Sequence, residues 1–233
     1  MIQTDRLLNG FFLKRYKRFF ADIKLENGQI ICAYCPNTGS LKSCLAENAR
    51  VLVDFNPSPK RKLDYTLEFI HSGSCWIGIN PQRANNIVHD ALKQNIIPDL
   101  SVYESIQREV SFLNSRFDFL LSNQNINHYI EVKSVTLVNE SFYEFPDAIT
   151  KRGQKHISDL IKVVEQGQKA SMFYLIQRSD AKIFRPAHEI DPDYANLLKK
   201  AVASGVTVYC YDTLISPPDI QVGSLVNVDL SYV

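Results

Sequence analysis

The sequence has no apolar run long enough to cross a membrane, and its first residues do not resemble a signal peptide. A membrane-spanning helix needs about 20 consecutive apolar residues, and no stretch of the 233 residues approaches that length. The first six residues contain no charged region followed by an apolar one. These absences predict a cytoplasmic protein without a membrane partner.

The sequence also lacks the cysteine pattern of a disulfide framework or of a zinc site. Its five cysteines are Cys32, Cys35, Cys44, Cys75 and Cys210, an odd number at irregular spacing. The first two have the spacing of half a zinc site, but no second pair of cysteines or histidines follows at a matching distance. We therefore expect buried or free thiols and no zinc.

No glycine-rich phosphate loop, internal repeat or low-complexity segment is present, and the net charge is only +1. This charge is unevenly distributed along the chain. Residues 1–80 contain 11 Lys and Arg against 7 Asp and Glu, whereas residues 81–233 contain 15 against 18. A basic first part and a mildly acidic second part predict two domains with a boundary near residue 80. A polyanionic partner would bind the first domain.

Residues 1–80 contain about five short apolar segments with turn-rich connections between them. They are residues 13–23, 29–34, 50–55, 65–70 and 75–79. Five strands in so few residues predict a small all-β domain. A five-stranded OB-like barrel is the favoured form, and a β-sandwich is the alternative.

Basic residues gather at two places in this predicted barrel, an aromatic-rich segment and a loop between two strands. The cations are Lys14, Arg15, Lys17 and Arg18 in the segment and Lys60, Arg61 and Lys62 in the loop. Both places would suit the backbone of a single-stranded or duplex nucleic acid. The alternative is a solvated edge strand with a basic hairpin tip, because charges also keep sheet edges from pairing.

Residues 116–134 are predicted to form two strands joined by a hairpin, with three charged residues on one face. Glu131 and Lys133 share a face because side chains alternate along a strand, and Asp118 can lie opposite them. Charged groups seldom occupy an apolar sheet unless they are paired or bind a metal. Two carboxylates beside an ammonium group can hold a divalent cation. An ordinary hairpin with a surface Asp and a Glu–Lys pair is the alternative.

This spacing resembles the core of the PD-(D/E)xK nucleases, in which an Asp, a hairpin and a Glu-x-Lys strand follow one another. The resemblance implies that Asp118 and Glu131 hold Mg²⁺, or Mn²⁺, while Lys133 contacts the attacking water or the scissile phosphate. The Val132 carbonyl would be a further ligand. Glu109 is a candidate additional ligand, since some of these enzymes use an acid upstream of the Asp.

The remaining segments of the second part alternate between strands and helices. We expect helices over residues 81–94, 150–166 and 191–204 and strands over residues 169–176 and 206–211, which gives an α/β domain. Thr150 is a suitable N-cap for the second helix, and Gly167 ends it. The histidines outside this helix are expected to be structural. They are His71, His89, His128 and His188.

The polar side of the predicted second helix carries several cations in its first turn. The residues assigned to that side are Lys151, Arg152, Gln154, Lys155 and His156. Cations at a helix N-terminus oppose the macrodipole, so a docked phosphate or acidic partner accounts for them better than a solvated helix start.

Several sequence blocks together resemble the sugar fermentation stimulation protein family of prokaryotes. They are residues 15–22, 35–39, 116–119, 129–137, 145–148 and 152–156. They follow one another in the family's order across nearly the whole chain. On that basis the chain is identified as a member of the family. The resemblance implies an OB-like domain over residues 1–80 and a PD-(D/E)xK nuclease-like α/β domain over residues 81–233. It also implies that Gln154 corresponds to the motif Gln of some nucleases of this superfamily.

Two functions follow from these observations. The first is a Mg²⁺-dependent nuclease that hydrolyses phosphodiester bonds of DNA. Its catalytic residues would be Asp118, Glu131, Lys133 and Gln154. The second, which the family resemblance implies, is a non-catalytic DNA-binding regulator of sugar (maltose) metabolism. A protein that only binds DNA has no evident need for two carboxylates facing a phosphate backbone. The two carboxylates therefore favour the nuclease. A sugar or protein-interaction module is a third interpretation, supported by the family name alone.

No base-reading helix-turn-helix is visible, so we expect backbone-dominated, salt-sensitive binding of DNA. The sequence leaves the oligomeric state open.

Overall fold

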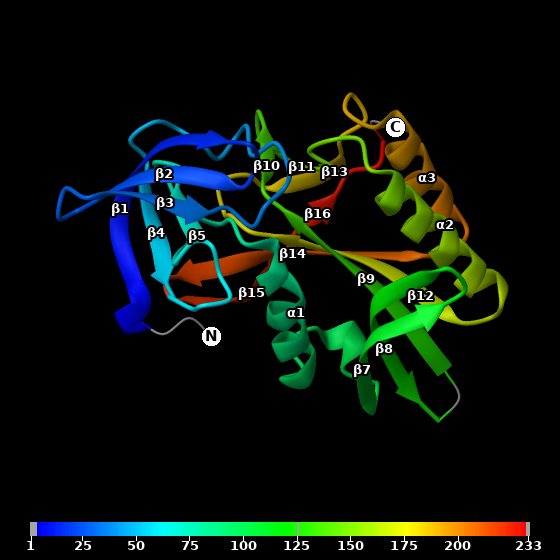
Figure 1. The fold of residues 1–233 in the computed structure, drawn as a ribbon. Coiled ribbons are helices and arrows are strands. Elements are labelled where there is room, and N and C mark those ends of the chain that lie inside the picture. Colours follow the sequence, from blue (N-terminus) through cyan, green and yellow to red (C-terminus); the bar gives the residue numbers. More distant parts are fainter. Residues whose placement is uncertain (1–3, 125, 232–233) are drawn as a thin grey trace.

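The first domain is a closed barrel of five strands with a sixth short strand on its edge (Figure 1). The computed structural model describes residues 4–124 and 126–231. The elements of the first domain are η1 (Thr4–Arg6), β1 (Leu7–Tyr16), β2 (Phe20–Leu25), β3 (Ile30–Tyr34), β4 (Arg50–Phe55), β5 (Tyr65–His71) and β6 (Trp76–Gly78).

The order of the strands around this barrel is that of an OB-fold. β1 pairs with β2 and β4, β2 with β3, and β4 with β5, all antiparallel, and the barrel closes where β3 meets β5 in parallel. Alternate residues point inward, as the buried Ala21, Ile23 and Leu25 of β2 show. The OB-like prediction is confirmed and the sandwich alternative is wrong.

One sequence expectation in this domain fails. Residues 13–23 were expected to form one strand, but β1 and β2 meet there in a tight hairpin. Lys17 and Arg18 form its turn in the left-handed region, with φ of 48° and 63°. Such turns are normally signalled by Gly, Asn or Asp, and neither residue is of that kind. The chain therefore reverses where its sequence carries no turn signal.

The second domain is built on a six-stranded mixed sheet. Its order is β15-β14-β12-β9-β8-β7, in which β9, β12 and β14 run parallel and the outer strands are antiparallel. The helices are η2 (Pro81–Arg83), α1 (Ala84–Lys93), η3 (Pro98–Leu100), α2 (Lys151–Glu165) and α3 (Pro192–Ala203). The strands of this sheet are β7 (Ser105–Phe112), β8 (Ser115–Asn123), β9 (Ile126–Val135), β12 (Lys169–Ile176), β14 (Thr207–Ser216) and β15 (Asp219–Leu225).

A second, smaller sheet lies beside the main one. It has the order β10-β11-β13-β16, from β10 (Leu137–Asn139), β11 (Phe142–Phe145), β13 (Ile183–Pro186) and β16 (Asn227–Val228). In the described part of the chain, no helix combines the length and the apolar character that crossing a membrane requires.

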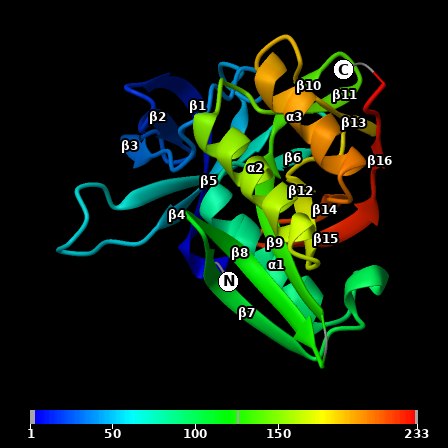
Figure 2. The same cartoon turned by 90° about the vertical axis from the view of Figure 1, so that its right-hand side faces the viewer.

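Helices cover both faces of the main sheet, α2 and α3 on one side and α1 on the other (Figures 1 and 2). The central strand β12 shows this division. Its Met172 and Tyr174 pack in the cluster with α2 and α3, whereas Phe173 and Leu175 pack in the cluster with α1. A strand buried on both faces is a nearly continuous apolar run, which is the pattern that predicted this strand.

The two domains share an interface near the chain's C-terminal hairpin. Leu52 and Phe69 of the barrel pack against Ile215 of β14 and Ile220 of β15. The backbone N–H of Gly78 also donates to the carbonyl of a second-domain residue, Gln177, at 2.9 Å. The last strands of the second domain therefore cover part of the first.

Candidate functional site

Strands β8 and β9 separate at Asp118. Their paired register ends at Phe119 and Ile130. One residue further on, Asp118 Oδ2 accepts a hydrogen bond from the Val132 N–H at 2.7 Å, in the role that a strand carbonyl plays elsewhere in the ladder. Asn85 of α1 donates to the other oxygen at 2.6 Å. The Asp118 carboxylate is thus fixed at the fork between the two strands.

Glu131 and Lys133 lie on the α2 side of β9. The Lys133 ammonium donates to Glu131 Oε1 at 2.6 Å, and the ring of His156, in the second turn of α2, donates to the same oxygen from Nδ1. Glu131 is only 3% exposed. Its other oxygen, Oε2, is buried and has no hydrogen-bond partner among the described residues.

The protonation of the two acids reflects this crowding. Burial, followed by the negative charge of Glu131, raises the pKa of Asp118 to about 6. Burial alone would also raise the pKa of Glu131, but the hydrogen bond from His156 and the charge of Lys133 outweigh it, so this pKa lies below its usual value. Two acids whose pKa values are driven apart are typical of a functional site.

The donor atoms of this site fit a hard divalent cation. Within residues 4–124 and 126–231, no three His, Cys, Asp or Glu side chains form a ready-made metal cluster. Two carboxylates nevertheless lie close enough for the charge of Glu131 to shift the pKa of Asp118. A buried acceptor without a partner costs about 1–3 kcal/mol, and a cation bound at Glu131 Oε2 would offset that cost. Carboxylate oxygens are the ligands that Mg²⁺ and Ca²⁺ prefer.

The other predicted catalytic and metal residues have different partners. Glu109 lies on β7 across from Asp118, and its carboxylate forms an ion pair with Arg116 at 2.7 Å. Gln154 donates from Nε2 to Asp191, the N-cap of α3, at 2.8 Å. The structure therefore brings together Asp118, Glu131 and Lys133 and gives Glu109 and Gln154 other contacts.

Two residues of the site were not among the predicted ones. His156 was assigned to the polar side of its helix, which is wrong, because the ring is buried against Glu131. It lies on the face of Gly153, Ile157 and Leu160, all buried. Its three- and four-residue spacing from these neighbours was a signal in the sequence. Asn85 gave no such signal, because its link to Asp118 depends on how α1 packs on the sheet.

The basic residues of the first domain divide into two kinds. Arg15 donates to the carbonyls of Asn37 and Gly39 at 2.6 and 2.9 Å, and Arg61 donates to Thr66 Oγ1 at 2.6 Å. These two arginines hold loops in place. The other predicted cations are exposed, namely Lys14, Lys17, Arg18, Lys60 and Lys62.

The cations of α2 are exposed at the start of the helix. Lys155 donates to the carbonyl of Asn114, and Lys151 lies 3.3 Å from Asp193 of α3. With Lys200 they line an open groove of about 460 Å³ between α2 and α3, and Arg152 is exposed beside it. A larger cavity of about 660 Å³ lies between α1 and the β14–β15 hairpin, and Asp118, Glu131 and Lys133 do not line it.

A five-stranded OB-like barrel followed by an α/β domain defines a class of two-domain proteins. Within that class the chain belongs to the sugar fermentation stimulation protein family. The family model of the SfsA N-terminal OB domain matches residues 13–79, and that of the sugar fermentation stimulation protein RE domain matches residues 82–219. The family resemblance of the sequence blocks is thereby confirmed.

Relatives with this architecture are similar over almost the full length. The chain is 46% identical to the sugar fermentation stimulation protein homolog of Shewanella frigidimarina over 228 residues, 96% of each chain. It is 42% identical to the homolog of Geotalea uraniireducens over 223 residues, 95% of this chain and 96% of the relative. A solved structure, "The structure of Pyrococcus Furiosus SfsA in complex with Ca2+", matches 98% of each chain with a TM-score of 0.87 and 24% identity, which shows the shared fold.

Proposed function

We propose that this protein is a metal-dependent nuclease that binds DNA and hydrolyses its phosphodiester bonds. The observation that carries the proposal is the buried pair of Asp118 and Glu131 beside Lys133, in which Glu131 Oε2 has no partner among the described residues. The relative from Pyrococcus furiosus was solved with Ca²⁺, which supports a divalent cation. Mg²⁺ or Mn²⁺ would serve in catalysis.

The chemistry is a displacement at phosphorus. The oxygen of a water forms a bond to phosphorus, the bond from phosphorus to one ester oxygen breaks, and the proton lost by the water is balanced by protonation of that leaving oxygen. A cation at this site lowers the pKa of water and stabilises charge on the phosphoryl oxygens. Asp118, Glu131 and the Val132 carbonyl would hold it. Lys133, kept in place by Glu131 at 2.6 Å, would position the attacking water.

The proposed partner is DNA, bound through its backbone. The exposed cations of the barrel and of the start of α2 would neutralise phosphates, so affinity should fall steeply as salt rises. We further propose that the protein acts in the cytoplasm. A role in sugar metabolism has only the family name in its support.

The test is a cleavage assay with Mg²⁺ or Mn²⁺ on single-stranded, duplex and flapped DNA. The Asp118→Ala and Lys133→Ala proteins should each lose roughly 100-fold or more in rate, the scale of a removed catalytic group. Lys182→Ala, an exposed lysine outside the site, is the matched control and should cut like the wild type. If the wild type binds every substrate and cuts none, the proposal fails and a non-catalytic DNA-binding regulator replaces it.

A further inference from the structure

The outer face of β1, β2 and β3 carries a row of aromatic rings. The pairing register sets Phe20 of β2 between Tyr16 of β1 and Tyr34 of β3. The rings of Tyr16 and Phe20 are stacked with centroids 5.5 Å apart and 15° between their planes. Phe19, at the end of the β1–β2 turn, stacks on Tyr34 at 6.4 Å and 8°. Four rings thus form two stacked pairs across three strands.

Tyr16 and Phe19 are exposed, and Phe20 and Tyr34 are half-buried, although the barrel has an apolar interior beside them. Tyr16 and Phe19 are 39% and 41% exposed, and Phe11 on the same strand is 40% exposed. Their neighbours along the strands, Ala21 and Ala33, are fully buried in the core. Large apolar side chains gathered on a surface mark a site of interaction.

The charges around the rings are almost all positive. The exposed cations are Lys14, Lys17, Arg18 and Lys24. In the sequences of β1, β2 and β3 there is a single acid, Asp22, which lies 3.5 Å from the Lys14 ammonium and accepts a hydrogen bond from the Tyr16 hydroxyl. The face therefore suits a partner that has negative charges and flat, stackable groups.

We propose that this face binds single-stranded nucleic acid, with bases stacked on the aromatic row and phosphates held by the surrounding cations. In a duplex the faces of the bases are covered by their neighbours, so rings of this kind select a single strand. An oligosaccharide can also stack on aromatic rings, but a neutral oligosaccharide has no negative charges for the four cations to bind. The inference rests on the proposed DNA-binding function and narrows it to single strands.

The site lies apart from the candidate catalytic residues. The aromatic rings belong to β1–β3 of the first domain, whereas Asp118, Glu131 and Lys133 belong to β8 and β9 of the second (Figure 1). Binding can therefore be measured separately from cleavage, in EDTA, where no divalent cation is available.

The experiment measures the affinity of the full-length protein for a labelled 12-nucleotide oligo(dT). A duplex of the same length, an abasic strand of the same charge and maltoheptaose are compared with it. Oligo(dT) should bind at least tenfold more tightly than the duplex and the abasic strand. The Tyr16→Leu and Phe19→Leu proteins keep an apolar side chain but lose the ring, and each should bind oligo(dT) about tenfold more weakly. Phe142→Leu, a half-buried aromatic of the second domain, should match the wild type.

Three results would overturn the inference. They are wild-type affinity in both ring variants, equal affinity for the abasic strand, and preference for the duplex or for maltoheptaose. The Asp118→Ala protein separates this inference from the nuclease. If it and the wild type bind oligo(dT) with the expected ring dependence and the wild type cuts nothing, only the nuclease proposal fails. If the wild type cuts DNA but the ring variants bind normally, only this inference fails.

Discussion

Glu131 is held by two cationic or proton-donating groups from different elements. Lys133 lies two residues along its own strand, and His156 comes from α2, and both contact the same oxygen, Oε1. This arrangement fixes the carboxylate and leaves Oε2 for another ligand. A group that orients a metal-binding carboxylate in this way typically changes metal affinity by 10- to 100-fold.

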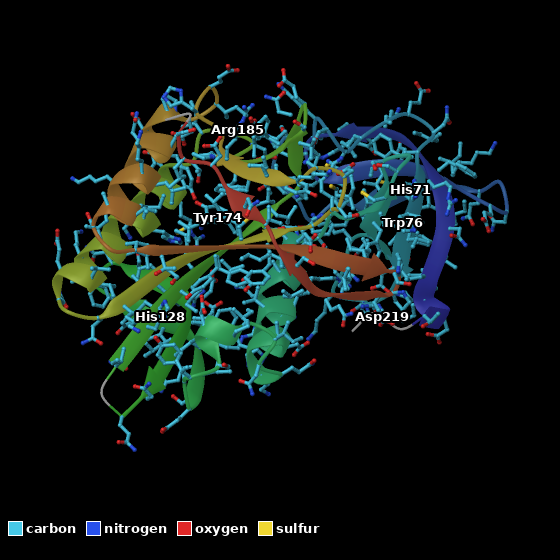
Figure 3. The ribbon with its side chains drawn as sticks, turned by 180° about the vertical axis from the view of Figure 1, so that it is seen from behind. His71, Trp76, His128, Tyr174, Arg185 and Asp219 are labelled. Carbon is cyan, nitrogen blue, oxygen red and sulfur yellow. The ribbon has the colours of Figure 1, made fainter. Side chains whose placement is uncertain are left out.

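We predict that the His156→Asn protein binds Mn²⁺ about 10- to 100-fold more weakly than the wild type. The smaller side chain cannot fix Glu131 from the same distance. Isothermal titration calorimetry without DNA would measure the affinity. His71→Asn, in the first domain and close to Trp76 (Figure 3), is the control and should bind like the wild type. Unchanged affinity in His156→Asn would show that the ring does not position Glu131.

His128 is a buried histidine on β9, three residues before Glu131 (Figure 3). It is 3% exposed, and its two ring nitrogens lie 2.9 Å from the Tyr103 hydroxyl and 2.5 Å from Ser171 Oγ. Burial, and then the charge of Lys169, lowers its pKa from 6.5 to about 4. The folded protein therefore keeps this ring neutral at a pH at which the unfolded chain protonates it.

We predict that His128 makes the protein less stable as the pH falls from about 6.5 to about 4. The neutral ring contributes its full stability above pH 6.5, and up to about 3 kcal/mol is lost on the way to pH 4. Urea unfolding at several pH values would compare the wild type with His128→Gln, whose stability should vary less over this range. Parallel curves for the two proteins would contradict the prediction.

At the scale of elements, one carboxylate joins the two parallel helices α2 and α3. Asp191 caps α3 through the Tyr194 N–H at 3.0 Å, and it also accepts from the Thr150 N–H and from Gln154 Nε2, both at 2.8 Å. It is 1% exposed. Two helix N-termini therefore depend on a single buried side chain.

We predict that Asp191→Ala lowers the free energy of unfolding by about 3 kcal/mol. The loss combines a helix cap, about 1 kcal/mol, with two part-buried hydrogen bonds, about 1 kcal/mol each. Asp193→Ala, which removes an exposed acid two residues away, should cost less than about 0.5 kcal/mol. Urea unfolding of both proteins checks this, and equal losses would refute the assignment.

The elements that the sequence predicted well are those with strong local signals. The hairpin around Asp118, the helix capped by Thr150 and the apolar strand β12 each combine periodicity with a cap or a turn. The turn at Lys17 and Arg18 lacked such a signal. The short strands β10, β11, β13 and β16 also escaped prediction. β10 has only three residues, and β11, β13 and β16 pair with one another across long stretches of the chain. His156 was predicted on the right helix but on the wrong face, although its spacing from Gly153, Ile157 and Leu160 indicated the buried side.

At the scale of the whole molecule, Arg178 joins the two domains. Its guanidinium pairs with Asp180 at 2.6 Å and donates to the carbonyls of Thr136 and, in the first domain, Ser43. The charge asymmetry of the sequence predicted two domains, but it carried no information on this contact. Residues 43, 136 and 178 share no pattern that local periodicity could reveal.

We predict that Arg178→Met uncouples the unfolding of the two domains. Asp180 would lose its partner at the interface, and the carbonyls of Thr136 and Ser43 would lose a donor, each lost hydrogen bond costing about 1 kcal/mol. Trp76 is the protein's one tryptophan and reports on the first domain, whereas far-UV circular dichroism reports on both. The two urea transitions should coincide in the wild type and separate in the variant. Lys182→Met is the control, and coincident transitions in Arg178→Met would contradict the prediction.

The packing of Ile215 and Ile220 against Leu52 and Phe69 also has a consequence for synthesis on the ribosome. The strands of the barrel have all been translated by residue 78, but the hairpin that covers this apolar face is made some 140 residues later. At about 5–20 residues per second, the nascent barrel exposes Phe69 and Leu52 for roughly 7–30 s. During that interval the nascent barrel carries an uncovered apolar face, which the β14–β15 hairpin then covers.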